Sequence, residues 1–388
     1  MKPSVALLVF SCLSCGNGER ISPASSGGAG GEGGASGASC DQDRDGQDAV
    51  TCGGDDCDDA RPDIFPGADD VCDGDDNDCD EIIDQDNACD CAEPPPEPEI
   101  EFSERVCMTG GWLDMGMGAT DPQAAHIAFI AVPVHRVFVS PFYLDAYEVT
   151  NRRFIACLDD GACEIEEPPP VPSAAWSRTE YSTEDQLDRP YWGASAQGAE
   201  TFCEWAGGWL PSEAQWERAA AGLGRTTESS EKDGPRPFPH GGEPSTCEQE
   251  WTRDCLPPDA SLPTAERVGQ LLPNPEGIYD LGGNVAEWTA DLFSMVAYEA
   301  CPAPCKNPCF GCADKTAGNP LLAPDEAPWP WGHAMRGGVI SISKSRAENL
   351  VFARSQYRDR GIGKGADNPV SIAFNHGFRC AYPAMPRQ

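Results

Sequence analysis

The chain has 388 residues, enough for one domain of about 250 residues and a smaller module. Its formal net charge of −37 predicts a surface that repels nucleic acid and anionic lipid headgroups and attracts cations. A hydrophobic content of 40% argues against wholesale disorder. Its 20 cysteines are too many for a reducing cytosol and predict disulfides formed in an oxidising compartment.

Residues 1–15 are typical of a signal peptide. The apolar run 5–10 is too short to span a membrane. Cys12 and Cys15 each follow a serine, and a small residue before Cys is the lipoprotein pattern, so we expect a lipid on Cys15 or Cys12. An ordinary cleaved signal is the alternative. The protein should then be extracytoplasmic and membrane-anchored, with residues 16–39, rich in Gly, Ser and Ala, as a flexible linker.

Residues 40–92 predict an acidic metal-binding module. Three carboxylates occupy positions 1, 3 and 5 of a calcium loop and a glycine occupies position 6: Asp41, Asp43, Asp45 and Gly46. Position 12, normally a bidentate Glu, is Cys52. One of Asp55, Asp56 and Asp58 would therefore have to complete the ligand shell.

A second loop in this module fits the same pattern with a different turn. Its positions 1, 3, 5, 9 and 12 are filled by Asp73, Asp75, Asn77, Glu81 and Asp84. Asp78 replaces the turn glycine, and the oxygen-only ligands favour calcium. The alternative is a solvated acidic tether. The interspersed cysteines weigh against this alternative, because a segment so poor in apolar residues needs disulfides and bound ions to fold.

Residues 57–80 resemble the repeat named after MopE, a surface copper-binding protein, in the order and spacing of Cys, Asp and the Pro-Gly-Ala segment 66–68. The resemblance implies metal binding. Residues 40–92 contain no histidine, which leaves imidazole ligation of copper unsupported. We therefore expect calcium as the cofactor and do not expect copper. The Pro- and Glu-rich residues 93–101 predict a stiff linker.

The composition of residues 102–388 is that of a globular domain. One helix is predicted over 196–206, where small and apolar residues recur at i, i+3, i+4 and i+7. A second is predicted over 212–221, because Ser212 and Gln215 form a capping-box pattern. Strand-like segments cover 135–139 and 142–144.

Six motifs follow one another in this domain: FYLDAYEVTN (142–151), FCEWAGG (202–208), WLPSEAQWE (209–217), GIYDLGGNVAEW (277–288), RGG (336–338) and GFRCA (377–381). Together they closely resemble the sulfatase-modifying-factor family, to which formylglycine-generating enzyme belongs. The resemblance covers about residues 107–382. It implies an irregular, loop-rich α+β domain related to C-type lectins.

The resemblance also implies a calcium site, because the family holds a structural calcium at segment 280–287. Carried over, its ligands are the side chains of Asp280 and Glu287 and the carbonyls of Gly283 and Val285. On the residues alone, two carboxylates flank a Gly-Gly-Asn turn, so oxygens can converge on one cation. A turn without metal is the alternative.

A disulfide between Cys203 and Cys380 is implied by the resemblance as well, with a free buried thiol as the alternative. The remaining cysteines leave more choices. Short-loop disulfides are plausible for two pairs, Cys157 with Cys163 and Cys247 with Cys255. The spacing of four others permits a zinc site, although two disulfides are favoured in an exported chain: Cys301, Cys305, Cys309 and Cys312.

Formylglycine-generating enzyme oxidises a substrate cysteine with oxygen, using copper(I) held by two cysteines shortly after Arg-Gly-Gly. Here Ile342 stands at the first position and Arg346 or Ala347 at the second. Hydrocarbon and guanidinium cannot replace thiolates. We therefore expect a non-catalytic calcium-stabilised binding or scaffold module, whose ligand is an unknown peptide, protein or glycan.

Two alternatives remain open. One is an oxidase whose metal ligands have relocated, for instance to the cysteines between 301 and 312. The other is a relative of the iron-dependent sulfoxide synthases. These need clustered histidines, and the five histidines here are scattered along the sequence.

Overall fold

The computed structural model describes residues 40–85, 89–91, 99–117, 131, 133–165, 182–191, 194–223, 236–252, 255, 265–294, 297–301, 304–312, 319–320, 332–338, 358–360 and 376–384. The predicted signal peptide with Cys12 and Cys15, the linker 16–39 and the positions Ile342, Arg346 and Ala347 lie outside these residues. None of the helices in the described part has the length and apolar character needed to cross a membrane.

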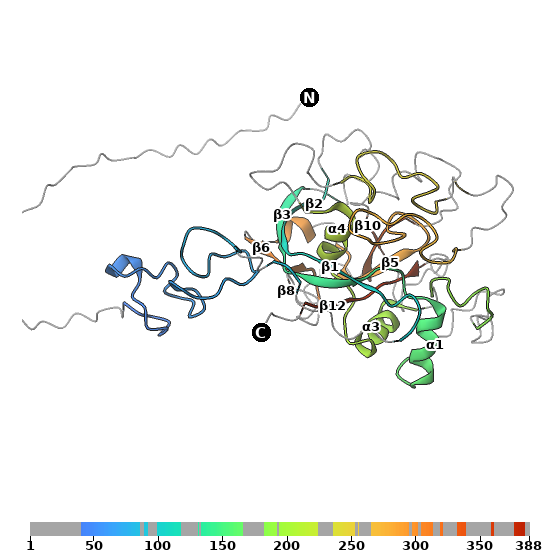
Figure 1. The fold of residues 1–388 in the computed structure, drawn as a ribbon, viewed down its shortest axis with the longest axis horizontal. Helices are drawn as coiled ribbons and strands as arrows, with labels where there is room; N and C mark the ends of the chain where they lie inside the picture. The colour runs from blue at the N-terminus through green and yellow to red at the C-terminus, as the bar shows by residue number, and fades with distance from the viewer. Residues whose placement is uncertain are drawn as a thin grey trace, which may run out of the picture.

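The described strands form four small sheets in the body of the protein (Figure 1). The first has the order β1 (Arg105–Met108), β4 (Phe142–Asp145), β12 (Ala381–Pro383). The second has the order β10 (Arg358–Arg360), β9 (His333–Arg336), β5 (Ala286–Leu292), β11 (His376–Gly377). The third has the order β2 (Gly111–Met115), β3 (His135–Val139), β6 (Cys305–Lys306), and the fourth pairs β7 (Pro308–Cys309) with β8 (Asn319–Pro320). Both predicted strand segments are confirmed, as β3 and β4.

The helices of the body are α1 (Asn151–Asp159), α3 (Ala196–Trp205), α4 (Glu213–Ala221) and the short α5 (Ala297–Ala300), and η1 (Val50–Cys52) lies in the acidic module. Both halves of the predicted capping box of α4 are present, between Ser212 and Gln215. All nine residues of α4 are buried, because it packs against strands of three sheets: β2 and β3, β5 and β9, and β7. Helix α1 was not predicted, although Thr150 caps it by accepting a hydrogen bond from the amide of Arg153.

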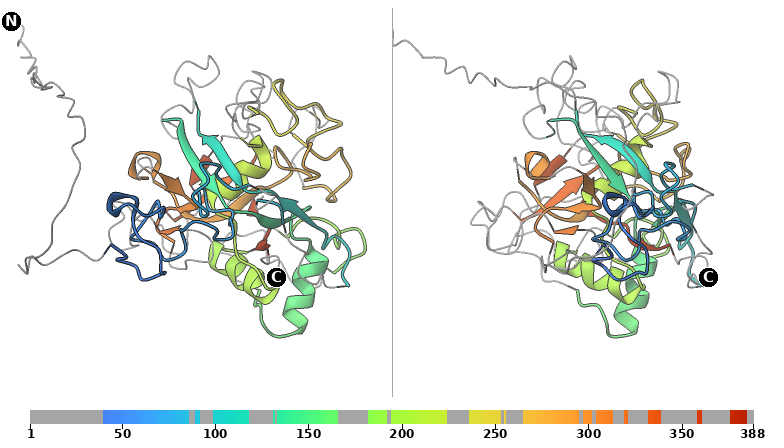
Figure 2. Two further views of the ribbon diagram at one scale, coloured as in Figure 1. Left: turned by 60° about the vertical axis from the view of Figure 1, so that its left-hand side comes forward. Right: turned by 90° about the vertical axis from the view of Figure 1, so that its left-hand side faces the viewer.

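Two large hydrophobic clusters account for most of the core in the described residues, beside a small one at Cys309 and Cys312. One joins α1 and α3, which lie side by side in Figures 1 and 2, through stacked rings of Phe154, Tyr191 and Phe202. The other surrounds Trp216 of α4 and the inward faces of β2, β3 and β4. Arg336 and Glu287 face each other in the register of β9 and β5, and Gly377 of β11 pairs with Glu287. This register brings the terminal Gly-Phe-Arg-Cys motif beside the Asp280–Glu287 segment.

Nine disulfides join all 18 cysteines that follow residue 39. The predicted pair Cys203–Cys380 is present, as are the two predicted short-loop pairs. The four cysteines of 301–312 form two disulfides, as favoured from the sequence. Four more lie in or next to the acidic module: Cys40–Cys52, Cys57–Cys79, Cys72–Cys89 and Cys91–Cys107.

Removing the Cys203–Cys380 disulfide by substituting serine for both residues is expected to cost more stability than removing Cys157–Cys163. The first pair is separated by 177 residues and the second by 6. The chain-entropy model gives upper values of about 5 and about 2 kcal/mol for such loops. Urea unfolding of the two double variants measures the difference. Equal losses would contradict the expectation.

The acidic module projects from the side of the body where β3 and β6 lie, as the blue segment of Figure 1 shows. Asp75 forms an ion pair with Lys306 of β6, and the hydroxyl of Ser140 donates to the carbonyl of Cys72 at 3.2 Å. Gly74 lies against the ring of Phe138, where a Cβ atom would come within 3.0 Å. The module is therefore attached to the body by side-chain contacts as well as by the Cys91–Cys107 disulfide.

Candidate metal sites

The first acidic loop brings its predicted carboxylates together. Oxygens of Asp41, Asp43 and Asp45 lie within 4.8 Å of one another, and so do oxygens of Asp43, Asp56 and Asp59. Asp43 belongs to both groups. Of the three residues proposed to complete the shell, Asp56 is the one that joins it. Asp59 was not predicted, although its spacing of three residues from Asp56 was visible in the sequence.

Local structure holds this loop in place. The amide of Arg44 donates to Asp41 at 2.6 Å and the amide of Asp45 donates to Asp43 at 3.2 Å. Gly46 adopts a φ of 99°, which permits the tight turn that a calcium loop needs. The Cys40–Cys52 disulfide closes the segment. Backbone hydrogen bonds and the disulfide thus fix the direction of the carboxylates.

Asp56 gives the strongest support for a cation site in this cluster, because it is only 2% exposed. Its Oδ1 accepts from the amide of Asp58 at 2.9 Å, whereas its Oδ2 has no hydrogen-bond partner in the described part of the chain. The buried Oδ2 atoms of Asp43 and Asp45 have no hydrogen-bond partner either. Burial, together with the charges of Asp45, Asp56 and Asp41, raises the pKa of Asp43. Buried acceptor oxygens without donors are what a hard cation such as calcium requires.

The second predicted loop is arranged differently from the expectation. Arg61 binds Asp73 and Asp75, and Lys306 also binds Asp75. Burial raises the pKa of Asp75, but the two cations outweigh it and lower that pKa overall. Asn77 accepts a hydrogen bond from the amide of Val71. The side chains predicted to share one ion are therefore separately engaged.

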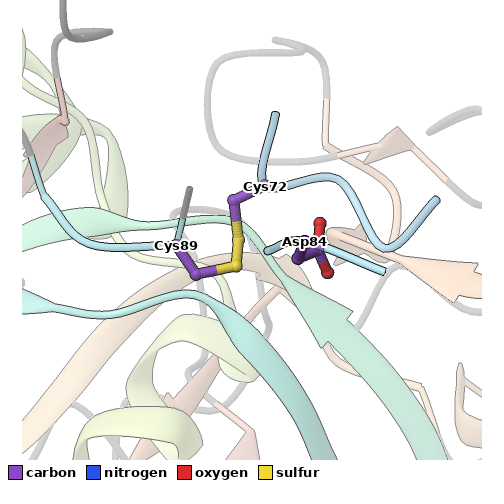
Figure 3. Close-up of side chains that lie close together, drawn as sticks. All are labelled: Cys72, Asp84 and Cys89. Atoms are coloured by element: carbon purple, nitrogen blue, oxygen red, sulfur yellow. A yellow bond between two sulfur atoms is a disulfide. The ribbon is translucent and has the colours of Figure 1, made fainter. Parts of the chain in front are cut away.

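Asp84 and Glu81 also depart from that predicted loop. Figure 3 shows Asp84 beside the Cys72–Cys89 disulfide, and its Oδ1 accepts from the amides of Asp73 and Gly74 at 3.0 Å. Glu81 is exposed, with a φ of 74°. The acids that do converge in this half of the module are Asp70, Asp76 and Asp78, whose oxygens lie within 4.8 Å of one another.

In the large domain, the segment 280–287 is buried. Asp280 accepts from the amide of Gly269 at 3.1 Å through Oδ2. Glu287 receives both arms of the Arg379 guanidinium, at 2.7 and 2.8 Å, and the indole N–H of Trp216 at 2.9 Å. Each oxygen of Glu287 thus already accepts a charge-assisted hydrogen bond. Asp280 therefore accepts fewer of these hydrogen bonds than Glu287.

Two further buried acids, missed from the sequence, surround this segment. Glu148 accepts from the amide of Val285 at 3.1 Å and from the Asn284 side chain at 2.7 Å. Glu250 contacts Nε2 of His240 at 3.1 Å, and its Oε2 has no hydrogen-bond partner among the described residues. Glu148 lies within a recognised motif and could have been suspected. Glu250 lies 30 residues upstream of Asp280, with no local signal.

Electrostatics distinguish this acidic cluster from ordinary ion pairs. Burial, followed by the charges of Asp280 and Glu287, raises the pKa of Glu148 well above its usual value. Burial, followed by the charge of Glu250, raises the pKa of Asp280 to about 7. Four buried carboxyl groups therefore share the field of Arg379. Such a cluster would be stabilised by a divalent cation, and its donors are the oxygens that calcium prefers.

Arg336 of the Arg-Gly-Gly motif is fully buried. Its guanidinium donates to Glu217 and to Glu213, and Tyr298 contacts the same group at 3.1 Å. Gly337 follows with a φ of 81°, where a Cβ atom would come within 2.9 Å of the Leu281 carbonyl. The motif thus anchors the end of β9 on α4. The positions expected to bind copper in the family follow shortly after it, beyond the described residues.

The fold agrees with the comparisons to known proteins. The model of the sulfatase-modifying factor enzyme 1-like domain matches residues 91–384, and that of a putative metal-binding motif matches residues 56–85. The chain therefore belongs to the sulfatase-modifying-factor family. The first acidic loop, with Asp41 to Asp45, precedes the second match.

Relatives named formylglycine-generating enzyme match over most of their length. The protein of Streptomyces coelicolor is 27% identical over 338 residues, covering 76% of this chain and 94% of that protein. The protein of Bos taurus is 25% identical, covering 70% and 72%. A serine/threonine-protein kinase pkn1 of Chlamydia pneumoniae is 27% identical over 311 residues, but this chain spans only 39% of its length.

Among solved structures, PvdO from Pseudomonas aeruginosa matches with a TM-score of 0.50 and 21% identity, covering 71% of this chain and 93% of that one. This likeness concerns the fold alone. Together with the family match it confirms the predicted fold class, a loop-rich α+β domain of the formylglycine-generating-enzyme type.

Proposed function

We propose that this protein is an exported surface lipoprotein whose sulfatase-modifying-factor-like domain is a non-catalytic binding or scaffold module, stabilised by calcium. The proposal that the domain is non-catalytic is supported by the disulfide bonding of its cysteines. All 18 that follow residue 39 are joined in nine disulfides. A copper(I) centre of the family type needs two thiolates, and Ile342 with Arg346 or Ala347 stands where they are expected.

The calcium part of the proposal is supported by two groups of carboxylates. The first site would use the carboxylates of Asp41, Asp43, Asp45, Asp56 and Asp59. The second would use Asp280 and the surrounding buried acids of the large domain. Both sets offer only hard ligands, and both contain a buried carboxylate oxygen without a donor, on Asp56 and on Glu250. Calcium would relieve the repulsion among these groups and so favour the folded state.

Export and membrane attachment are supported by composition. Nine disulfides in one chain require an oxidising compartment. The lipid would be carried by Cys15 or Cys12, and the ligand of the domain would be a peptide, protein or glycan of the cell envelope. The net charge of −37 disfavours nucleic acid.

An activity assay tests the non-catalytic proposal. The protein is incubated with a cysteine-containing sulfatase-type peptide, copper, oxygen and a thiol reductant. The mass of the peptide is then measured by mass spectrometry. We expect no aldehyde product. Steady turnover would contradict the proposal and favour an oxidase with relocated metal ligands. The variant with Ile342→Cys and Ala347→Cys is the companion measurement, and we expect it to gain copper binding that the parent lacks.

A further inference from the structure

A second kind of donor cluster lies in the large domain, away from the calcium segment. The carboxylate of Asp291 on β5 and the sulfurs of Cys309 and Cys312 lie within 4.8 Å of one another, and all three residues are buried. The sulfur of Cys309 is 3.6 Å from Oδ2 of Asp291. The two cysteines form a disulfide. The cluster therefore combines a reducible sulfur pair with a fixed oxygen ligand.

The environment of Asp291 keeps its carboxylate in position. Its Oδ2 accepts from the amide of Glu213, the first residue of α4, at 2.7 Å. Its Oδ1 accepts from the amide of Phe310 at 2.8 Å. The positive end of a nine-residue helix stabilises an anion at this place. The Glu213 amide lies on α4 and not on the turn that carries the sulfurs, so this donor holds the carboxylate independently of the S–S bond.

The turn that carries the sulfurs has the form of a zinc-binding loop. Cys309 and Cys312 are separated by two residues, and Gly311 adopts a φ of 70° between them. A Cys-x-x-Cys turn of this kind is a common half of tetrahedral zinc sites. The spacing of the sequence suggested a partner in Cys301 and Cys305. Those two belong to a different core cluster, so the third donor is Asp291 instead.

Space for a fourth ligand lies beside Asp291. A cavity of about 20 Å³ is lined by Asp291, Pro308 and Phe310 and by the rings of His135 and Tyr298. This is room for one water molecule. Three protein ligands and one water are the arrangement of an open tetrahedral zinc site.

We propose that reduction of the Cys309–Cys312 disulfide creates a zinc site formed by the two thiolates and the Asp291 carboxylate, with water from the adjacent cavity as the fourth ligand. The S–S bond is cleaved by two electrons, either from two thiols, which become a disulfide and release two protons, or from a phosphine and one water molecule, which become a phosphine oxide and release two protons. Two protons are taken up to give two thiols. Zinc then displaces these two protons to solvent. The carboxylate favours zinc over copper(I), because copper(I) prefers sulfur alone.

The test uses the full chain under native conditions. It is treated with a graded phosphine reductant, the free thiols are mapped by alkylation, and zinc uptake is measured by competition with a chromophoric chelator. We expect about one zinc per chain after reduction and none at this site before it. Cobalt(II) in place of zinc should give a thiolate-to-metal charge-transfer band in the near ultraviolet, which reports sulfur ligation independently of affinity.

Variants assign the ligands. Replacing both Cys309 and Cys312 with Ser should abolish this zinc uptake and the cobalt band, and Asp291→Asn should weaken zinc at least tenfold. The matched control replaces Cys301 and Cys305 with Ser and should keep both signals. Circular dichroism confirms that each variant is folded. Zinc uptake unchanged by loss of Cys309 and Cys312, or a pair that stays oxidised until the whole chain unfolds, would overturn the proposal.

Discussion

Arg379→Ala is expected to lower the free energy of unfolding of the large domain by about 3–5 kcal/mol, the range for breaking a buried ion pair. Arg379 is fully buried and holds Glu287 with two hydrogen bonds. It also donates to the carbonyls of Asp145, Ala146 and Tyr279. Its loss would leave the acidic cluster without its guanidinium and would remove one donor from each of three carbonyls, of which that of Ala146 still accepts from the amide of Tyr279. Each of these effects disfavours the folded state.

Arg267→Ala is the matched control, because Arg267 is exposed and close in sequence to the same segment. Substitutions at such positions change stability by about 0.5 kcal/mol or less. Arg379→Lys should be intermediate, since it keeps the charge but loses the bidentate geometry. Chemical denaturation of the three variants in one buffer provides the measurement. A loss at Arg379 no greater than at Arg267 would show that the cluster does not depend on this side chain.

Chelation of calcium is expected to make the acidic module sensitive to proteases. Without a cation, the carboxylates of Asp41, Asp43, Asp45 and Asp56 repel one another at short range. Asp56→Asn removes a buried charged ligand but keeps the shape, so we expect calcium affinity to fall by about tenfold or more, which is about 1.4 kcal/mol. Calorimetric calcium titration and timed proteolysis, each with and without a chelator, measure these two effects.

Asp48→Asn provides the control within the same loop. Its side chain is exposed, and it is the carbonyl of Asp48 that accepts the amide of Asp56, which the substitution preserves. We expect calcium affinity within about twofold of the parent. Protease resistance that is the same with calcium and with chelator would remove calcium from the account of this module. Equal losses in the two variants would mean that net charge, rather than a defined site, attracts the ion.

Local patterns were sufficient for several elements of the fold. The Ser212 and Gln215 spacing located α4, and the apolar runs located β3 and β4. Helix α1 was missed because Arg152 and Arg153 interrupt its apolar pattern. Arg153 is buried nonetheless, since it pairs with Asp145 of β4. A charged residue that a distant strand neutralises cannot be recognised from its own neighbours in sequence.

The same reason explains why the predicted residues of the first acidic loop lie together in the structure and those of the second do not. Asp41, Asp43 and Asp45 lie in one short loop, where spacing alone fixes their convergence. The second acidic loop depends on Arg61 and on Lys306, more than 200 residues away, which bind the acids that a calcium loop would need. Asp291 and Cys309 meet only because β5 and β7 are brought together by the fold. Spacing predicts sites within one loop, and tertiary structure decides the others.

Because of the Cys91–Cys107 disulfide, the proline-rich stretch between these two residues is not the only covalent link between the acidic module and β1. Along the backbone the two residues are separated by 16 positions, yet their Cα atoms lie 5.8 Å apart. The sulfur bridge is therefore the shorter covalent route between the acidic module and β1. A single cleavage or an insertion in that stretch would leave the two parts joined. Evolution is thus free to change the length and sequence of the stretch without detaching the module.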